Sequence, residues 1–284
     1  MLVRTESAAG VATLTLDRPR RHNSLVPRLL TDLLTAVEGL PDETRAVVLA
    51  AEGRSFSTGG DVRAFAERAG LPVEGRPRAP LGTPRSDEAG DNAGDEAGDK
   101  ALAEYADEIV GLLNRAVLAL LRLEVPTVAA VHGPVTGGSL GLVLAADIVL
   151  AGPEASFAPW YTVVGFGPDG GWTALLPERI GRARATAVQL LNETIDAPTA
   201  VAWGLAHGLH DDVRRAARDT AAELTGRRAV AVAKRLLTPD LDTVAARLEA
   251  ERRAFVRQVT TPEAREGMIA FLSGGDSSED RKRP

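Results

Sequence analysis

The stretch VPTVAAVHGPVTGGSLGLVLAADIVLA, residues 125–151, decides the fold of this chain. Thr127 to Val131 is a short and largely apolar run, typical of a strand covered on both faces. A glycine-rich turn and a short helical segment, 138–146, follow it, and 147–151 has the pattern of a second strand. Because strand, turn, helix and strand in this order indicate parallel strands joined by crossovers, the sequence predicts an α/β fold.

The same order occurs earlier in the chain. Val11 to Leu16 alternates as a strand does, leucines at helical spacing follow between Leu29 and Leu40, and Ala46 to Ala51 is another apolar run. From Gly181 onward the pattern is helical only. We therefore expect an α/β core over 1–195 and a helical C-terminal region over 196–284. The helices predicted in the latter part of the chain cover 183–191, 197–203, 213–224, 229–237, 241–258 and 262–272.

Composition excludes several classes of protein. The 284 residues include no cysteine and only four histidines, which removes thiolate chemistry and leaves little for a histidine-rich metal site. The net charge is −6 and aromatic residues make up 4%, so a nucleic acid is not an expected partner. No apolar run approaches the roughly 18 residues of a membrane span. We expect a cytoplasmic protein with no membrane partner.

A low-complexity insertion separates the early elements from the later ones. Residues 86–99 (SDEAGDNAGDEAGD) contain six acidic and no basic side chains, and 71–84 are rich in proline and glycine. Such composition favours a solvated surface loop, which we expect over 71–100. An acidic docking segment or a lid is the alternative. The apolar stripe from Ile109 to Leu121 then predicts a helix.

Two glycine turns could carry chemistry, because each follows a buried strand and precedes a helix. Gly59-Gly60 and Gly137-Gly138 would expose backbone N–H groups where negative charge is favoured. Two such groups directed at one point could stabilise a thioester enolate. The alternative is that these glycines only permit tight turns.

Several long motifs in this order resemble the enoyl-CoA hydratase/isomerase (crotonase) superfamily. They are Asn23-Ser24-Leu25 after Arg18-Pro19, VVLAAEGRSFSTGGDV (47–62), the stretch 125–151, ASF (155–157) with GFGPDGGWTALLPERIGRARA (165–185), and TPEAREGMIAFL (261–272).

The resemblance implies a spiral of ββα units followed by a helical C-terminal region for oligomerisation, which would form a homotrimer or dimer of trimers. It also implies an acyl-CoA thioester as substrate. It implies no metal or redox cofactor, since coenzyme A is part of the substrate. By motif position, Gly60 and Gly138 match the family's oxyanion N–H donors. The positions expected to bind substrate are Ser24, Ser57, Thr58, Gly59, Asp61, Gly137, Gly141, Trp160 and Phe166.

The chain departs from the hydratases of this family. Hydratases handle water with two glutamates, and those positions fall here at Gly141 and Tyr161. Gly141 has no side chain, and a phenol with a pKa of about 10 is a poor base. Water addition by two carboxylates is therefore not expected.

One carboxylate remains in a suitable place. Asp169, in Gly167-Pro168-Asp169-Gly170-Gly171, resembles in position the acid of some family isomerases, of certain acyl-CoA hydrolases and of the aromatic dehalogenases. Burial near aromatic residues would raise its pKa toward a useful value. The alternative is that Asp169 caps a helix. Tyr161 could donate a hydrogen bond to substrate or form a wall of the pocket.

The sequence thus predicts an enoyl-CoA double-bond isomerase in which Asp169 shuttles the proton. Thioester hydrolysis, hydration and a dehalogenase-type displacement are alternatives on the same scaffold, as is a non-catalytic acyl-CoA binder. A serine hydrolase is a further alternative, because Gly137-Gly138-Ser139-Leu140-Gly141 matches G-x-S-x-G and His132 lies nearby in sequence.

Overall fold

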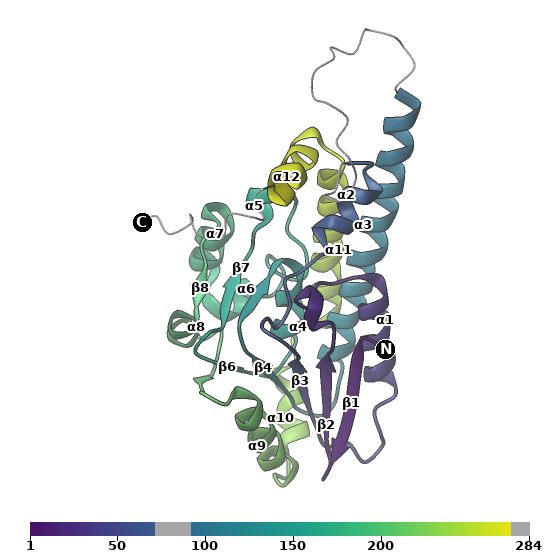
Figure 1. The fold of residues 1–284 in the computed structure, drawn as a ribbon. Helices are drawn as coiled ribbons and strands as arrows, with labels where there is room; N and C mark the ends of the chain where they lie inside the picture. Colours follow the sequence, from purple (N-terminus) through teal and green to yellow (C-terminus); the bar gives the residue numbers. More distant parts are fainter. Residues whose placement is uncertain (72–91, 274–284) are drawn as a thin grey trace.

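A computed structural model describes residues 1–71 and 92–273 of the chain (Figure 1). A six-stranded sheet has the strand order β1-β2-β3-β4-β6-β9, and a three-stranded sheet has the order β5-β7-β8. The pairs β1-β2 and β7-β8 are antiparallel and the other pairs are parallel. The strands are β1 (Val3–Ala8), β2 (Val11–Leu16), β3 (Ala46–Ala51), β4 (Thr127–Val131), β5 (Pro134–Thr136), β6 (Ile148–Ala151), β7 (Ser156–Ala158), β8 (Ile195–Asp196) and β9 (Gly208–Leu209).

Helices cover both faces of the larger sheet. Alternate side chains of β3 belong to two cores: Val47, Leu49 and Ala51 pack in the main core, and Ala46, Val48 and Ala50 pack in a second core that α9 covers. This two-sided burial explains why β3 consists of six apolar residues in a row. The early and middle helices are α1 (Pro27–Glu38), α2 (Val62–Arg68), α3 (Asn92–Leu121), α4 (Leu140–Leu144), α5 (Tyr161–Val164) and α6 (Leu176–Ile180).

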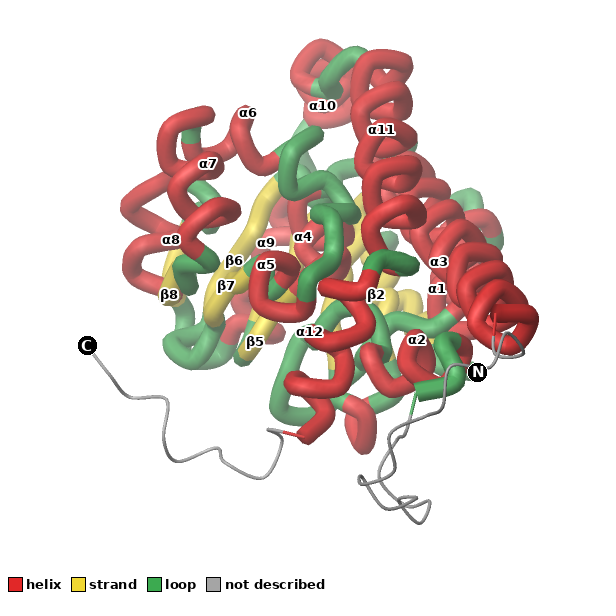
Figure 2. The backbone as a smooth tube through the Cα atoms, turned by 90° about the horizontal axis from the view of Figure 1, so that it is seen from above, coloured by secondary structure: helices red, strands yellow, loops and turns green. Residues whose placement is uncertain are grey.

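The later helices pack against the α/β core. Figure 2 shows α11 beside α3, with α7 and α8 on the opposite side of the strands. Leu248, Phe255 and Met268, from the last two described helices, belong to the main core. These helices are α7 (Arg182–Leu191), α8 (Ala197–Trp203), α9 (Val213–Thr225), α10 (Val230–Leu237), α11 (Leu241–Val259) and α12 (Pro262–Ser273).

Three details differ from the sequence prediction. The exposed edge strand β1 and the three-residue strands β5 and β7 were not predicted. The region after Gly181 is not purely helical, because β8 pairs with β7 and β9 with β6. Both strands have only two residues, too short for a sequence pattern.

The predicted surface loop over 71–100 is wrong in part. Residues 72–91 lie outside the described residues, but α3 begins at Asn92. Asp99 pairs with Arg265 of α12 at 2.5 Å, so tertiary contact supports the helix where composition suggested a loop. Alanine, glutamate and lysine in this segment also have good helix propensity.

The boundary between 195 and 196 remains a prediction. Among the described helices, none has the length and apolar character needed to cross a membrane.

Candidate active site

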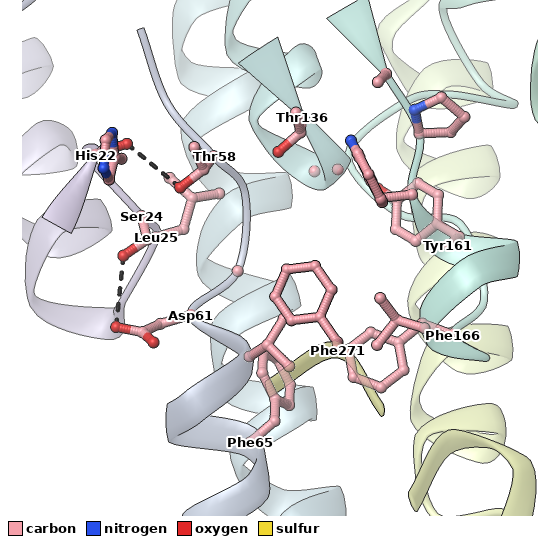
Figure 3. Close-up of a pocket in the computed structure, with 18 of the residues that line it drawn as sticks. His22, Ser24, Leu25, Thr58, Asp61, Phe65, Thr136, Tyr161, Phe166 and Phe271 are labelled. Carbon is pink, nitrogen blue, oxygen red and sulfur yellow. Dashed lines mark hydrogen bonds between the residues drawn. The ribbon is translucent and has the colours of Figure 1, made fainter. Parts of the chain in front are cut away.

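A cavity of about 770 Å³ lies between the glycine turns and helices α2, α3, α5, α11 and α12 (Figure 3). Polar residues of the N-terminal segment lie on one side of it, and aromatic side chains lie on the other. Seven of the residues predicted for the site because of their side chains line this cavity: Ser24, Thr58, Asp61, Trp160, Tyr161, Phe166 and Asp169. Gly60, Gly137 and Gly138 line it as well.

The two glycine turns meet at this cavity. Ser57 and Val135 form a parallel bridge, and the Thr136 N–H donates to the Ser57 carbonyl at 3.0 Å. A β-carbon on Gly59 would lie 2.5 Å from the Thr136 carbonyl oxygen, so only glycine permits this approach, and its φ of +71° also favours glycine. The prediction that both turns lie at one site is consistent with this contact.

The amides of Gly60 and Gly138 are available to a ligand. Within the described part of the chain, the Gly60 N–H donates to no protein acceptor. Gly138 lies in the first turn of the 3-10 helix Gly137–Ser139, where N–H groups have no partner inside the helix. Both residues line the same cavity, so a carbonyl oxygen placed there could accept from both.

The Asp169 carboxyl group lies beside Gly138. A β-carbon on Gly138 would be 2.7 Å and 3.0 Å from the two carboxyl oxygens. The Tyr161 hydroxyl donates to this carboxyl group and lies 3.0 Å from the Asp169 carbonyl oxygen. Asp169 is therefore placed next to one predicted oxyanion donor, and Tyr161 contacts Asp169 in addition to forming part of the cavity wall.

Asp169 is not a helix cap. Helix α6 begins at Leu176, after a capping position at Leu175. The amide that a capping Asp169 would take, the Gly171 N–H, donates instead to Glu251 at 2.7 Å. The alternative structural role considered for Asp169 is therefore wrong.

Burial raises the pKa of Asp169 to about 7. The Tyr161 hydrogen bond lowers this pKa and the negative charge of Glu251 raises it, but burial has the largest effect. Burial, together with the nearby Asp169 charge, also holds the pKa of Tyr161 well above 10. Asp169 can therefore gain or lose a proton near neutral pH, while Tyr161 remains a donor.

Asp61 lines the cavity but has a different environment. Its carboxylate accepts hydrogen bonds from Arg18 and Arg21 at 3.2 Å and from Ser24 at 3.4 Å. Burial would raise its pKa, but the bonds and charges of Arg21 and Arg18 outweigh burial and lower it. Asp61 therefore stays ionised. Asp61 is the capping position of α2, but its side chain accepts no hydrogen bond from that helix.

Three residues predicted to bind substrate do not line the cavity: Ser57, Gly59 and Gly141. Ser57 is fully buried and donates to the Asn23 carbonyl at 2.8 Å, so it fixes the N-terminal segment against the turn. Gly59 and Gly141 permit close packing behind the cavity wall. These three residues therefore lie behind the cavity wall and not on its surface.

Aromatic side chains enclose the cavity, and the sequence analysis did not single out three of them, Phe65, Phe255 and Phe271. Phe65 is at the centre of this group, with ring centroids 5.5 Å from Phe166 and 5.8 Å from Phe255. Phe271 of α12 contacts Trp160 at 6.4 Å. We call Phe65, Phe166, Phe255 and Phe271 the aromatic chamber. Phe65 and Phe255 lie outside the quoted motifs, and all four residues lie far apart in sequence, so the fold brings them together.

A basic group at the cavity was also missed. The cavity is lined by Arg20, Arg21 and His22. Four of the five residues from 18 to 22 are basic, which was a visible signal in the sequence. Within the described residues, no group of three histidine, aspartate or glutamate side chains converges as metal ligands would.

The serine-hydrolase alternative is not supported. Ser139 is fully buried, and its hydroxyl is directed at the carbonyls of Thr136 and Ser57, at 2.7 Å and 2.9 Å. His132 contacts the Gly53 carbonyl at 2.9 Å through Nε2. Ser139 therefore stabilises the glycine turn and is not available as a nucleophile.

The sequence model of the enoyl-CoA hydratase/isomerase family matches residues 6–74 and 93–278. The chain belongs to this family. Its fold agrees: an enoyl-CoA hydratase from Bacillus halodurans superposes with a TM-score of 0.78 at 22% identity, over 95% of this chain and all of that one. The predicted crotonase-like α/β fold with C-terminal helices is thus confirmed.

Relatives in the enoyl-CoA hydratase/isomerase family carry different reaction names. The 4-chlorobenzoyl coenzyme A dehalogenase-2 of an Arthrobacter species is 29% identical over 95% of this chain and 90% of its own length. The 1,2-epoxyphenylacetyl-CoA isomerase of Escherichia coli is 30% identical over 93% of this chain and 92% of its own length. Membership of the family therefore identifies the chain as a crotonase-family acyl-CoA enzyme. It does not identify the reaction, which has to be inferred from the residues of the site.

Gly141 stands at the first position of the glutamate pair expected in hydratases of the enoyl-CoA hydratase/isomerase family. A β-carbon there would lie 2.1 Å from the Gly170 carbonyl oxygen, inside the packing of two backbones. No side chain fits without movement of the segment that carries Asp169. At the second position of the expected glutamate pair, the Tyr161 hydroxyl is bonded to Asp169.

Proposed function

We propose that this protein is an enoyl-CoA double-bond isomerase, with Asp169 as the single proton shuttle. One observation carries the proposal: a buried carboxyl group with a pKa of about 7 lies beside Gly138, in a cavity that the Gly60 amide also lines. The other carboxyl group on the described cavity wall, Asp61, is held by two arginines. Isomerisation needs one group of this kind, whereas hydration by the usual route needs two.

The reaction conserves all atoms. Ionised Asp169 takes a proton from the α-carbon of a 3-enoyl thioester, and the electrons move onto the thioester oxygen. The amides of Gly60 and Gly138 hold this oxygen as the dienolate forms. Asp169 then returns the proton to the γ-carbon and leaves a 2-enoyl thioester. Since no atom is oxidised or reduced and no water is consumed, we propose that no metal or redox cofactor takes part.

The aromatic chamber supports an apolar acyl group as the substrate. The Phe65 ring would lie 3.0 Å from a β-carbon on Gly60, so it adjoins the predicted oxyanion donors. Phe166 and Phe271 line the same cavity (Figure 3), so an acyl chain leaving that point would meet apolar rings. Burial against these rings stabilises an apolar group and excludes water from the dienolate.

Location and assembly belong to the same proposal. We propose that the protein acts in the cytoplasm, because a chain with no cysteine fits a reducing compartment. We also propose a homotrimer or dimer of trimers, with an acyl-CoA thioester as its small-molecule partner.

The test is deuterium exchange on a panel of 2-enoyl- and 3-enoyl-CoA thioesters in D2O, followed by NMR and mass spectrometry. The protein should move the double bond and introduce deuterium at the α- or γ-carbon. Asp169→Asn should lower this rate by a factor of about 10²–10⁴, the usual contribution of a general acid–base group. Binding of CoA thioester should persist. Asp219→Asn, which changes an exposed aspartate of α9, is the matched control.

The alternatives give different results. Release of free CoA thiol identifies a hydrolase, addition of water across the double bond identifies a hydratase, and halide release from a haloaryl thioester identifies displacement by Asp169. Binding without any of these reactions identifies a non-catalytic binder. Each of these outcomes, without bond migration, contradicts the isomerase proposal.

A further inference from the structure

Glu251 of α11 is a buried carboxylate that has no part in the reaction proposed above. It is 4% exposed and lies on the apolar face of α11, between Leu248 and Phe255. A charged group in such a place is costly unless other groups satisfy it. Its partners therefore indicate why it is there.

Four donors surround this carboxylate, and all come from one short segment. Glu251 accepts from the N–H of Gly171 at 2.7 Å, of Thr173 at 2.7 Å and of Ala174 at 3.0 Å. The Thr173 hydroxyl donates to it at 2.6 Å. We call residues 171–174 the anchored turn. A carboxylate can accept all four bonds because it is an acceptor at both oxygens.

The anchored turn directly follows Asp169. Gly170 and Gly171 have φ angles of +64° and +92°, so no regular helix or strand holds this part of the chain. Gly170 is also packed tightly against Gly138: a β-carbon on it would lie 2.3 Å from the Gly138 carbonyl oxygen. With Glu251 on one side and Gly138 on the other, the backbone that carries Asp169 is held at two points.

Few charged or titratable groups face Asp169. Helix α5 contributes Tyr161 and α11 contributes the charge of Glu251. On the side of Gly138, the neighbour from helix α3 is the apolar Leu113. The 3-10 turn Gly137–Ser139 presents only backbone atoms to Asp169. The neighbouring arginine of α11, Arg252, is bonded to Glu249 and Asp107 instead. Glu251 therefore provides a negative charge near Asp169 that no described side-chain cation accompanies.

We propose that Glu251 is a positioning residue for Asp169: its carboxylate holds the anchored turn and thereby sets the Asp169 carboxyl group against Gly138. The role of Asp169 as proton shuttle rests on the proposed function. The contact between Glu251 and the turn does not depend on that function, and it can be measured without turnover.

The experiment compares Glu251→Gln with the unchanged protein by two measurements. Hydrogen exchange of the amides in 169–174 should become about tenfold faster or more, because glutamine keeps one acceptor oxygen and turns the other into a donor, so either the Gly171 N–H or the N–H groups of Thr173 and Ala174 lose their acceptor. The Asp169 titration, followed by NMR on protein with 13C-labelled aspartate and assigned by its absence in Asp169→Asn, should move to lower pH by about one unit. Removing a nearby negative charge makes ionisation of Asp169 easier.

Two controls separate charge from position. Glu249→Gln removes the same charge from the same helix and should leave both measurements unchanged. Thr173→Val removes one of the four bonds and keeps the charge, so exchange should rise slightly while the Asp169 titration stays in place.

An unchanged Asp169 titration in Glu251→Gln, or unchanged exchange of 169–174, overturns the proposal. If Glu251→Gln does not fold, Glu251→Asp replaces it, since it keeps the charge and shortens the side chain. Exchange of the anchored turn must rise there too, and unchanged exchange again overturns the proposal. Because neither measurement needs a substrate, absence of isomerase activity would contradict the proposed function without affecting this test.

Discussion

At the scale of single residues, Asp169 couples the chemistry of the site to the stability of the fold. A carboxyl group with a pKa of 3.8 in the unfolded chain and about 7 in the folded protein binds its proton more tightly when folded. It therefore contributes stability that is fully present below about pH 4 and is lost as pH rises through about 7.

Asp169→Asn should consequently gain stability relative to the unchanged protein as pH rises. Between pH 5 and pH 8 the difference in unfolding free energy should move in favour of the variant by about 2 kcal/mol, since asparagine cannot ionise. Urea denaturation at the two pH values measures this difference. The exposed Asp219→Asn should show no such change, and an equal difference at both pH values would show that Asp169 is not buried as a titrating group.

Single residues also mark how far the sequence could predict the site. Gly60, Gly138 and Asp169 lie in motifs, Tyr161 lies between two of them, and the structure brings all four to one cavity. Ser57 lies in the same motif, yet its side chain is directed into the protein interior. A motif gives the position along the chain, but the direction of a side chain depends on the packing around it.

At the scale of elements, the segment from α5 to α6 packs on the 3-10 turn and α4 with no space between the backbones. Gly141 and Gly170 are where this contact is closest. Replacing a glycine there must separate the two segments or distort them.

Gly141→Ala should therefore lower the free energy of unfolding by about 1–3 kcal/mol and lower the rate of deuterium exchange into substrate, because Asp169 moves with its segment. Gly141→Glu should not introduce hydration, although it places a glutamate at the position where hydratases have one. Denaturation and a water-addition assay measure the two effects. Gly111→Ala in α3, where the nearest atom outside the helix is 3.9 Å away, is the control and should be neutral or stabilising. Efficient hydration by Gly141→Glu would refute this interpretation of the contact.

The spacing of apolar residues predicted the bounds of α11 well, but it did not reveal what Glu251 on this helix binds. Val244, Leu248, Glu251, Phe255 and Val259 are its buried residues, at the spacing of one helix face. A glutamate in that apolar series was a signal that could have been noticed in the sequence. Its partners, 171–174, could not be inferred, because the loop that they form has no periodicity.

At the scale of the whole molecule, the strands buried on both faces were predictable, because a short continuous apolar run between turns is typical of a strand that helices cover on each side. β3 and β4 fit this pattern, and the structure confirms them. The start of α3 was not predictable, because its acidic first residues have the composition of a solvated loop, and tertiary contacts such as the bond between Asp99 and Arg265 of α12 show otherwise.

Exposed leucines bear on assembly. Leu190 and Leu191 at the end of α7 are 71% and 68% exposed, and Leu236 and Leu237 at the end of α10 are 83% and 82% exposed. Covering such side chains stabilises an oligomer. We expect sedimentation velocity to show trimers or larger assemblies, and Leu236→Ser with Leu237→Ser to shift them toward monomer. Arg235→Ser on the same helix should not, and a monomeric unchanged protein at micromolar concentration would contradict the expectation.

The contribution of α12 to the cavity has a consequence for biosynthesis. Phe271 and Leu272 form part of the wall, although the first wall residues occur near position 20. Domains generally begin to fold from the N-terminal side as the ribosome elongates the chain. The enclosure of the cavity is therefore finished only after Phe271 and Leu272 have emerged, so a nascent chain can have its sheet in place long before it can shield the cavity from water.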